Sequence, residues 1–183
     1  HIPRYKWLIS RFNDDGYHVI AKDHRGHGLC IGSKGLKGLF SDKDGWNKVV
    51  SDLEEVIVNS RNKFPDLDQF LIGHSMGSWV ALSLMAKGIS VKGLVLSGSS
   101  KVPSFIINAQ KLIINMQIIF FGKNSVSKLL DSLTMRSYNK SFAPNRTQSD
   151  WITSDRDSVD NYVEDPLCGF MVTNKLWYDL ADG

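Results

Sequence analysis

The sequence has few cysteines. Cys30 and Cys168 are the only two among 183 residues. Two cysteines so far apart in the sequence make neither a disulfide framework nor a cysteine-based zinc site. We therefore expect two free thiols, as in a protein of a reducing compartment.

An excess of one charge is also missing. The net charge is only +3, no block of lysine and arginine stands out, and basic residues do not alternate with aromatic ones. These features exclude the usual pattern of a nucleic-acid-binding protein. With 42% hydrophobic and 22% charged residues, the composition is that of a soluble globular domain, and the length suits one domain or one domain with a small insertion.

The ends of the sequence carry no recognisable start or stop. The first residue is His1, the opening "HIPRYKWLIS" has no signal-peptide pattern, and the last residues "LADG" close no evident element. We expect the sequence to be an internal piece of a longer protein, so a signal peptide before residue 1 stays an open alternative.

Helix and strand patterns alternate over the first hundred residues. The expected elements are a helix over 4–16, a strand over 17–22, a glycine-rich loop over 24–38, a helix over 43–63 capped by Asp42 or Asp44, a strand over 69–74, a helix over 76–87 ended by Gly88, and a strand over 92–97. This alternation predicts an α/β fold with a parallel central sheet and helices on both of its faces. The strands are nearly continuous apolar runs, which predicts burial on both sides.

The pattern changes after residue 100, where no strand is expected until about residue 165. Residues 104–121 form an apolar segment that is long enough for a membrane-spanning helix. Five polar side chains within the segment nevertheless make it a poor candidate for such a helix. We expect a helical cap, or lid, over 101–164, inserted into an α/β core formed by 1–100 and 165–183.

The stretch "FLIGHSMGSWVAL", residues 70–82, contains Gly73-x-Ser75-x-Gly77 between an expected strand and an expected helix. This spacing is typical of a nucleophile elbow, a sharp turn that exposes a serine. Residues two before and two after that serine approach too closely for side chains, which favours Gly73 and Gly77. Ser75 is the candidate nucleophile, and the backbone N–H of Met76 is the candidate oxyanion donor at the helix N-terminus.

Other histidines have plainer interpretations. We expect His74 to be a structural residue with a hydrogen-bond partner. His24, Arg25 and His27 cluster in the glycine-rich loop and are expected to order it near the site. Two neighbouring histidines supply too few ligands for a metal, and no metal site is predicted.

Three motifs together resemble the monoacylglycerol lipase and lysophospholipase branch of the α/β-hydrolases, also described as serine aminopeptidase S33-like or hydrolase-4 domains. They are "HIPRY" at 1–5, "DHRGHG" at 23–28 and "GHSMGS" at 73–78, and the run 150–170 looks like the cap of bacterial members. The resemblance implies a serine hydrolase that cleaves carboxylic esters of fatty acids, monoacylglycerols or lysophospholipids, through an acyl-enzyme on Ser75. It implies no metal or organic cofactor.

The sequence departs from this family at two places. Ser78 stands where many members have a further glycine, which is a mild change. His1 matches the later histidine of the family's oxyanion motif, so the resemblance places the second oxyanion donor upstream of residue 1.

No histidine follows the candidate nucleophile. The five histidines stand at 1, 18, 24, 27 and 74, whereas the family order is serine, then acid, then histidine. Asp179 and Asp182 come too early to be the acid and are interpreted as helix-end or surface charges. We therefore expect the catalytic acid and base downstream of residue 183, and no activity from this chain alone; the alternative is a complete but inactive hydrolase-like protein.

Two other functions stay open. One is a different reaction on the same scaffold, such as prolyl aminopeptidase or general esterase activity. The other is a non-catalytic binding protein that keeps the hydrolase fold. For partners we expect a small lipid ester and a transient contact of the cap with a membrane surface, without nucleic acid. We expect a cytoplasmic location, peripheral to the membrane, and the sequence does not indicate an oligomeric state.

Overall fold

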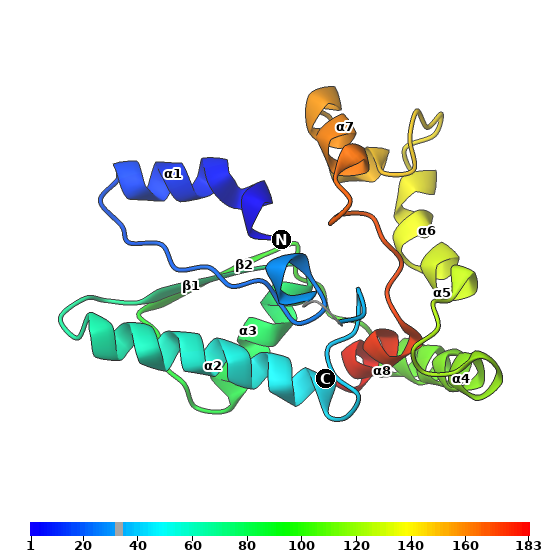
Figure 1. Cartoon of the computed structure of the whole chain (residues 1–183), viewed down its shortest axis with the longest axis horizontal. Helices are drawn as coiled ribbons and strands as arrows, with labels where there is room; N and C mark the ends of the chain where they lie inside the picture. The colour runs from blue at the N-terminus through cyan, green and yellow to red at the C-terminus, as the bar shows by residue number, and fades with distance from the viewer. Residues whose placement is uncertain (32–34) are drawn as a thin grey trace.

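The computed structural model describes residues 1–31 and 35–183. The elements in chain order are η1 (Ile2–Tyr5), α1 (Lys6–Asp14), η2 (Gly28–Ile31), α2 (Gly45–Lys63), β1 (Phe70–His74), α3 (Met76–Ala86), β2 (Gly93–Ser97), α4 (Ser104–Phe121), α5 (Lys128–Leu133), α6 (Met135–Lys140), η3 (Asp150–Ile152), α7 (Arg156–Glu164) and α8 (Asn174–Asp182). Figure 1 shows the two strands among α1, α2 and α3, with the later helices gathered at the other end of the molecule.

The central sheet is parallel, as the alternation of elements predicts. Strands β1 and β2 pair in register from Phe70 opposite Gly93 to His74 opposite Ser97. The helix α3 that joins them packs against β1 and α2. Four side chains with no exposed surface lie between these helices and the sheet: Val49, Val50, Val80 and Leu84. The α/β fold class is thus confirmed, and this core fixes the turn between β1 and α3.

The expected strand over 17–22 is wrong for the part of the chain that the structure describes. These residues have no regular secondary structure and belong to neither strand of the two-stranded sheet. The Tyr17 ring meets the Phe70 ring edge-on at 6.4 Å, so the segment passes the start of β1 without pairing with it. A β-strand exists only where its N–H and C=O groups meet a partner backbone, and the described residues supply none here.

The expected burial of both strands is also wrong. Phe70, Ile72 and Val95 are 55%, 43% and 54% exposed. Because alternate residues of a strand point to opposite faces, these three side chains lie on one face, and Leu71 packs into the core on the other. Apolar composition correctly predicted strands here, but it cannot say whether a second layer covers them.

The glycine-rich segment after residue 23 is a loop, as expected, with the short η2 turn inside it. Part of the predicted loop, residues 32–34, lies outside the described residues. Gly26 has a φ of +72°, and a Cβ on it would lie 2.5 Å from the Leu39 carbonyl oxygen. Glycine is therefore required at Gly26 by both backbone angle and space.

Three of the later helices begin at side-chain caps that the sequence contains. Ser127, Asp155 and Thr173 accept hydrogen bonds from the backbone N–H three residues on, at the starts of α5, α7 and α8. Over 101–164 no strand is present in the described residues, although Val126 forms an isolated bridge with Thr173. The boundary between core and cap stays a prediction.

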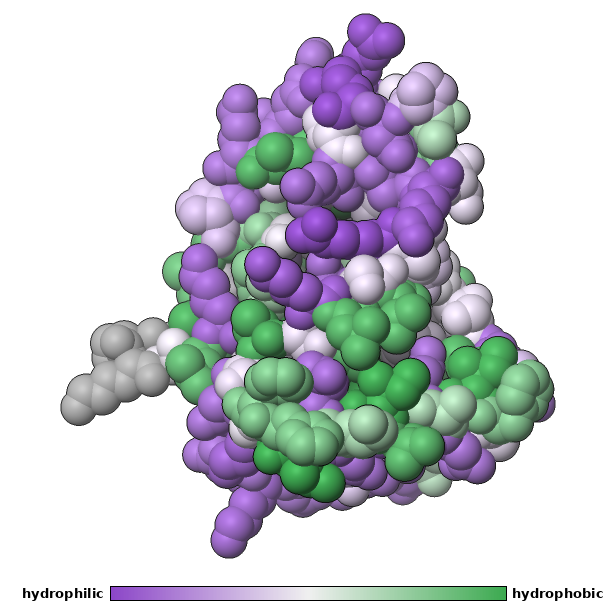
Figure 2. Space-filling view, turned by 90° about the vertical axis from the view of Figure 1, so that its right-hand side faces the viewer, coloured by the Kyte–Doolittle hydropathy of each residue, from purple (hydrophilic) through white to green (hydrophobic). Residues whose placement is uncertain are grey.

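Helix α4 is long, apolar and poorly covered. Only Ile114 is buried among its 18 residues, whereas Phe105, Ile119 and Phe120 are 73%, 77% and 72% exposed. By length and composition alone, α4 could cross a membrane, and only 6% of its 18 residues are buried in the structure. Figure 2 shows an apolar band low on the face where α4 lies.

Two acidic residues of α8 differ in environment. Asp182 is a surface charge, as expected, and pairs with Lys111 of α4 at 3.0 Å. Asp179 lies near the end of α8, as expected, but it is only 4% exposed, so the alternative interpretation as a surface charge is wrong. Burial raises the pKa of the Asp179 carboxyl, although Lys175, one turn earlier, forms an ion pair with it. Asp179 thus belongs to the packing between α8 and the start of α2.

Candidate active site

Ser75 occupies the turn between β1 and α3 in a backbone conformation that side chains rarely adopt. Its φ is +51° and its ψ is −123°. Such a conformation costs on the order of 1–3 kcal/mol and persists only where the surroundings impose it. The Ser75 side chain is exposed, directly before the first residue of the helix. Strand, strained serine and helix therefore follow one another as the elbow motif predicts.

The two glycines of the motif are not equivalent. A Cβ on Gly73 would lie 2.6 Å from the Gly77 carbonyl oxygen and 2.9 Å from the Ser78 Cα, so the strand and the helix leave room only for glycine. At Gly77 the nearest atom to an added Cβ is His24 Nε2, at 4.0 Å. The expectation of crowding is confirmed for Gly73 and wrong for Gly77, because that face of the helix looks toward the loop at 24 and not toward the strand.

Backbone hydrogen bonds hold the turn from both sides. Ser75 N–H donates to the Ser97 carbonyl at 2.8 Å, which extends the ladder of β1 and β2 by one bond. On the helix side, the Ser78 N–H and hydroxyl both donate to the Ser75 carbonyl, at 2.8 and 2.6 Å. Ser78, which stands where many family members have glycine, is completely buried, and its two hydrogen bonds hold the carbonyl group of the elbow serine.

Met76 is the first residue of α3 and half-buried. The first backbone N–H groups of a helix have no partner within the helix, and the helix dipole makes this end favourable for negative charge. The Met76 N–H therefore has no acceptor within the helix and lies beside Ser75. A backbone donor in this position is what an oxyanion hole requires.

The loop over 23–31 lies beside the start of α3 and is rich in hydrogen bonds. Arg25 donates two bonds to Asp52 of α2, at 2.7 and 2.9 Å, and His27 Nδ1 lies 3.0 Å from the Arg25 carbonyl oxygen. Burial acts to raise the pKa of the Asp52 carboxyl, but hydrogen bonds and charge from Arg25 and Lys22 outweigh it, and the pKa lies below its usual value. Arg25 and His27 order this loop, as expected.

The remaining residue of this loop cluster, His24, lies next to the N-terminal end of α3. It is half-buried, and its imidazole lies beside the first turn of α3. Burial, with a smaller contribution from neighbouring His27, lowers the pKa of His24 to about 4. A neutral ring next to the helix N-terminus is the form that this environment favours, because a cation would be both desolvated and opposed by the helix dipole.

Asp23 organises the loop and was not singled out from the sequence. It is 5% exposed, its Oδ1 accepts from the Ile2 N–H at 2.7 Å, and its Oδ2 accepts from the Leu29 N–H at 3.0 Å. A Cβ on Gly28 would collide with this carboxylate, which explains a glycine there. The signal was present in "DHRGHG", since an aspartate that ends an apolar run before glycines often accepts backbone N–H groups.

Activating groups are not found at Ser75 in the described part of the chain. No imidazole or carboxylate there hydrogen-bonds to the Ser75 hydroxyl, and His74 is engaged with the Ser97 hydroxyl at 3.1 Å, as a structural histidine would be. A hollow of about 540 Å³ lies between α2 and α8, lined by Trp46 and Lys175 among others, and it does not include the elbow. The elbow is thus formed, and within the described residues no imidazole or carboxylate is bonded to its serine hydroxyl.

This chain resembles a known protein family and several solved structures. The whole chain, residues 1–183, matches the Hydrolase_4 family, described as serine aminopeptidase, S33. The chain belongs to this family. In solved structures, it resembles a thermostable carboxyl esterase from Bacillus coagulans, with a TM-score of 0.85 and 28% identity over 98% of this chain and 58% of that one. A monoacylglycerol lipase from Paleococcus ferrophilus has the same fold, with a TM-score of 0.64 at 24% identity over 100% of this chain and 60% of that one.

Curated relatives carry lipid-hydrolase names. Phospholipase YtpA of Bacillus subtilis is 32% identical over 51% of this chain and 34% of its own length. Monoglyceride lipase of Mus musculus is 25% identical over 91% of this chain and 48% of its own length. The chain therefore spans half or less of the length of these relatives. The predicted resemblance to a monoacylglycerol lipase-like family of α/β-hydrolases is confirmed.

Proposed function

We propose that this chain carries the nucleophile and one oxyanion donor of a carboxylic ester hydrolase that acts on fatty acid esters, monoacylglycerols or lysophospholipids. The observation that carries the proposal is the backbone of Ser75, held at a positive φ between β1 and α3. A strained, exposed serine at a helix N-terminus is the arrangement that acyl transfer requires, and a serine in an ordinary turn has no need of it.

The chemistry assigns one role to each residue of the turn. Ser75 Oγ attacks the ester carbonyl carbon, and its proton passes to a general base as the bond forms. The carbonyl oxygen becomes an oxyanion, which the Met76 N–H and the N-terminus of α3 stabilise. Collapse expels the alcohol and leaves the acyl group on Ser75, and water then releases the fatty acid.

A lipid substrate is favoured by the apolar helix and by the names of the relatives. Helix α4 exposes Phe105, Leu112 and Ile119, which stand seven residues apart and so share one face. We propose that this face belongs to a cap that admits an acyl chain and touches a membrane surface. The curated names phospholipase and monoglyceride lipase agree with such a substrate.

Labelling with a fluorophosphonate probe tests the nucleophile. We expect the protein that contains this chain to be labelled, Ser75→Ala to lose the label, and Ser99→Ala, a substitution at an exposed serine outside the turn, to keep it. Loss of ester turnover in Ser75→Ala should reach roughly 10⁴-fold or more, because triad members act as a unit. A protein that neither reacts nor turns over esters would instead be a binding protein on the same fold.

The class of substrate is tested by a separate measurement. Hydrolysis of p-nitrophenyl esters of increasing acyl length, compared with hydrolysis of aminoacyl amides, distinguishes the ester hydrolase from an aminopeptidase. Faster cleavage of the amides would contradict the lipid assignment.

For the 183-residue chain by itself we expect no ester turnover above background, since all five histidines precede Ser75. Turnover by that chain, abolished by Ser75→Ala, would contradict this expectation.

A further inference from the structure

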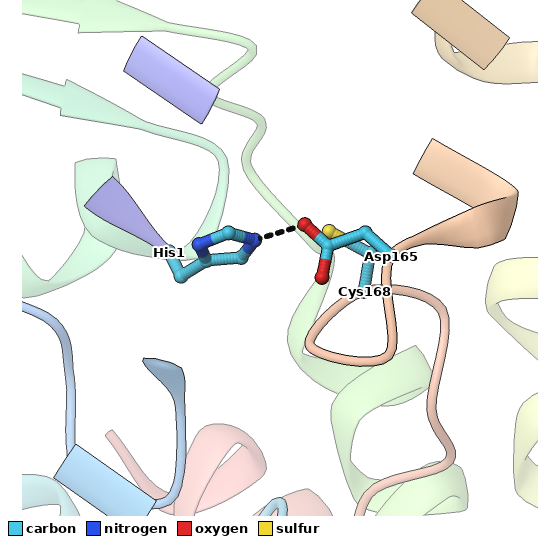
Figure 3. Close-up of side chains that lie close together, drawn as sticks. All are labelled: His1, Asp165 and Cys168. Carbon is cyan, nitrogen blue, oxygen red and sulfur yellow. Dashed lines mark hydrogen bonds and ion pairs between the residues drawn. The ribbon is translucent and has the colours of Figure 1, made fainter. Parts of the chain in front are cut away.

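Three metal-ligating side chains from distant parts of the sequence meet near the start of the chain. His1 stands before η1, whereas Asp165 and Cys168 belong to the turn that follows α7. His1 Nε2 lies 2.7 Å from Asp165 Oδ2, and one ligand atom from each of the three residues lies within 4.8 Å of the others. Figure 3 shows the His1 ring directed at the Asp165 carboxylate, with the Cys168 sulfur beside that carboxylate.

The imidazole is deeply buried and incompletely bonded. The His1 side chain is 4% exposed, and its Nδ1 is buried without a hydrogen-bond partner among the described residues. The contact with the Asp165 carboxylate, which can only accept, places a proton on Nε2, whereas Nδ1 has no contact that requires a proton or excludes one. The proton can therefore move to Nδ1 and leave the Nε2 lone pair for a metal. The Asp165 side chain is 27% exposed, so the cluster is closed on the His1 side and reachable from solvent on the other.

The turn that carries the other two ligands is already ordered. Asp165 Oδ1 accepts from the Leu167 N–H at 2.8 Å, and the Cys168 N–H donates to the Asp165 carbonyl at 2.9 Å. These bonds hold Oδ2 and the sulfur on the same side of the turn. A pre-ordered pair of ligands lowers the entropy that binding would otherwise cost.

We propose that His1 Nε2, an Asp165 carboxylate oxygen and the Cys168 thiolate bind a Zn²⁺ ion, with water as the fourth ligand. One nitrogen, one oxygen and one sulfur form a donor set that suits zinc, whereas magnesium and calcium require oxygen ligands. Tetrahedral zinc places its ligand atoms roughly 3.4–3.7 Å apart. The 2.7 Å contact must open by about 0.7 Å, and the other two distances, which are at most 4.8 Å, would need to close by no more than about 1.4 Å. Side-chain rotation covers changes of this size.

Proton balance is simple. Binding releases the Cys168 thiol proton to solvent, and the His1 proton moves to Nδ1, so zinc affinity increases with pH. The ion would join the segment before α1 to the turn between α7 and α8. Next to this site, the Ile2 N–H already binds Asp23, so the bound metal would also brace the loop beside the elbow. The proposal does not depend on ester hydrolysis.

Metal titration with Zn²⁺, and with Co²⁺ as a spectroscopic probe, tests the site. We expect one ion per chain, a Kd below about 10 μM, and a thiolate-to-Co²⁺ charge-transfer band. Cys168→Ser should abolish the band and raise the Kd for Zn²⁺ by more than about 100-fold, since even indirect partners of a metal site cost 10–100-fold. Cys30→Ser is the matched control, because Cys30 is the other free thiol and is exposed.

A second variant protects the test against misfolding. Asp165→Asn keeps an acceptor for the Leu167 N–H and should weaken Zn²⁺ binding while the far-ultraviolet circular dichroism stays unchanged. A Zn²⁺-dependent rise in the unfolding midpoint should appear in the parent chain and in Cys30→Ser only. A charge-transfer band that survives Cys168→Ser, or Zn²⁺ affinity that Asp165→Asn leaves unchanged, would overturn the proposal, as would a parent chain that binds neither metal.

Discussion

The backbone N–H of Ser75 donates a 2.8 Å hydrogen bond to the carbonyl oxygen of Ser97, the last residue of β2. This bond continues the parallel ladder one residue beyond β1 and into the turn. Because the sheet holds Ser75 on one side and Ser78 holds it on the other, the positive φ of Ser75 is imposed by its neighbours. Strain at this serine is therefore a property that mutation can measure.

Replacing Ser75 by glycine should stabilise the chain. Glycine adopts a φ of +51° at little cost, so we expect Ser75→Gly to raise the free energy of unfolding by about 1 kcal/mol. Ser75→Ala is the control: it removes the same hydroxyl but keeps the Cβ, and should leave stability nearly unchanged. Urea unfolding at pH 7 measures both. Equal stabilities of the two variants would show that the serine backbone is not strained.

The two elbow glycines should respond unequally to alanine. Gly73→Ala places a Cβ against the backbone of Gly77 and Ser78, which cannot move without breaking the turn, and should cost about 3 kcal/mol of stability. Gly77→Ala meets only open space and a side chain at 4.0 Å, and gains helix propensity, so its change should stay within about 1 kcal/mol. Urea unfolding compares them, and a larger loss at Gly77 would contradict the close approach of strand and helix at Gly73.

Local patterns predicted more of the fold than did expectations about layers. The α/β alternation, the helices over 4–16, 43–63 and 76–87, and the end of a helix at Gly88 follow from periodicity and glycine geometry, which are properties of short segments. Strand pairing over 17–22 and burial of Phe70 depend on a partner that a segment cannot specify. The same apolar run is a strand beside another strand and an extended chain without one.

The site divides in the same way. The turn that places Ser75 before Met76, and the close packing at Gly73, were predictable because the elbow is a single stretch whose spacing reflects its own backbone, whereas the catalytic roles of Ser75 and Met76 stay a prediction. Asp179 was misjudged, since burial of a helix-end aspartate depends on α2 packing against α8. The approach of His1 to Asp165 was not predictable at all, because 164 positions separate them and only the folded chain brings them together.

Asp23 should be a major determinant of loop stability. Asp23→Ala removes the acceptor for the Ile2 and Leu29 N–H groups in a buried setting, and should lower the free energy of unfolding by about 3 kcal/mol. Asp23→Asn keeps one acceptor oxygen and should cost about half as much. Asp14→Ala, at an exposed aspartate near the end of α1, serves as the control and should change little. A cost at Asp23 no larger than at Asp14 would contradict the bonding described.

Stability should fall in mild acid because of His24. The pKa of this residue is about 4 in the folded chain and 6.5 in its ordinary state, so the unfolded chain takes up a proton first. The contribution of His24 is complete above pH 6.5 and is lost as the pH falls toward 4, by up to about 3 kcal/mol. His24→Gln should flatten the decline in urea midpoint between pH 7 and 5. A decline in His24→Gln that stays parallel to that of the parent chain would contradict the assignment.

The apolar face of α4 should govern attachment to lipid. Phe105, Ile119 and Phe120 expose most of their surface, and each apolar side chain that enters a membrane interface contributes about 1.5–3 kcal/mol. Phe105→Glu, which replaces one such side chain, should therefore lower the partition onto phospholipid vesicles, measured by sedimentation, by at least tenfold, since about 1.4 kcal/mol corresponds to a factor of ten. Leu29→Glu is the matched control, since Leu29 is 89% exposed but lies far along the chain in the loop after Asp23. Equal losses from α4 and from Leu29 would mean that added negative charge, rather than this helix face, weakens the attachment.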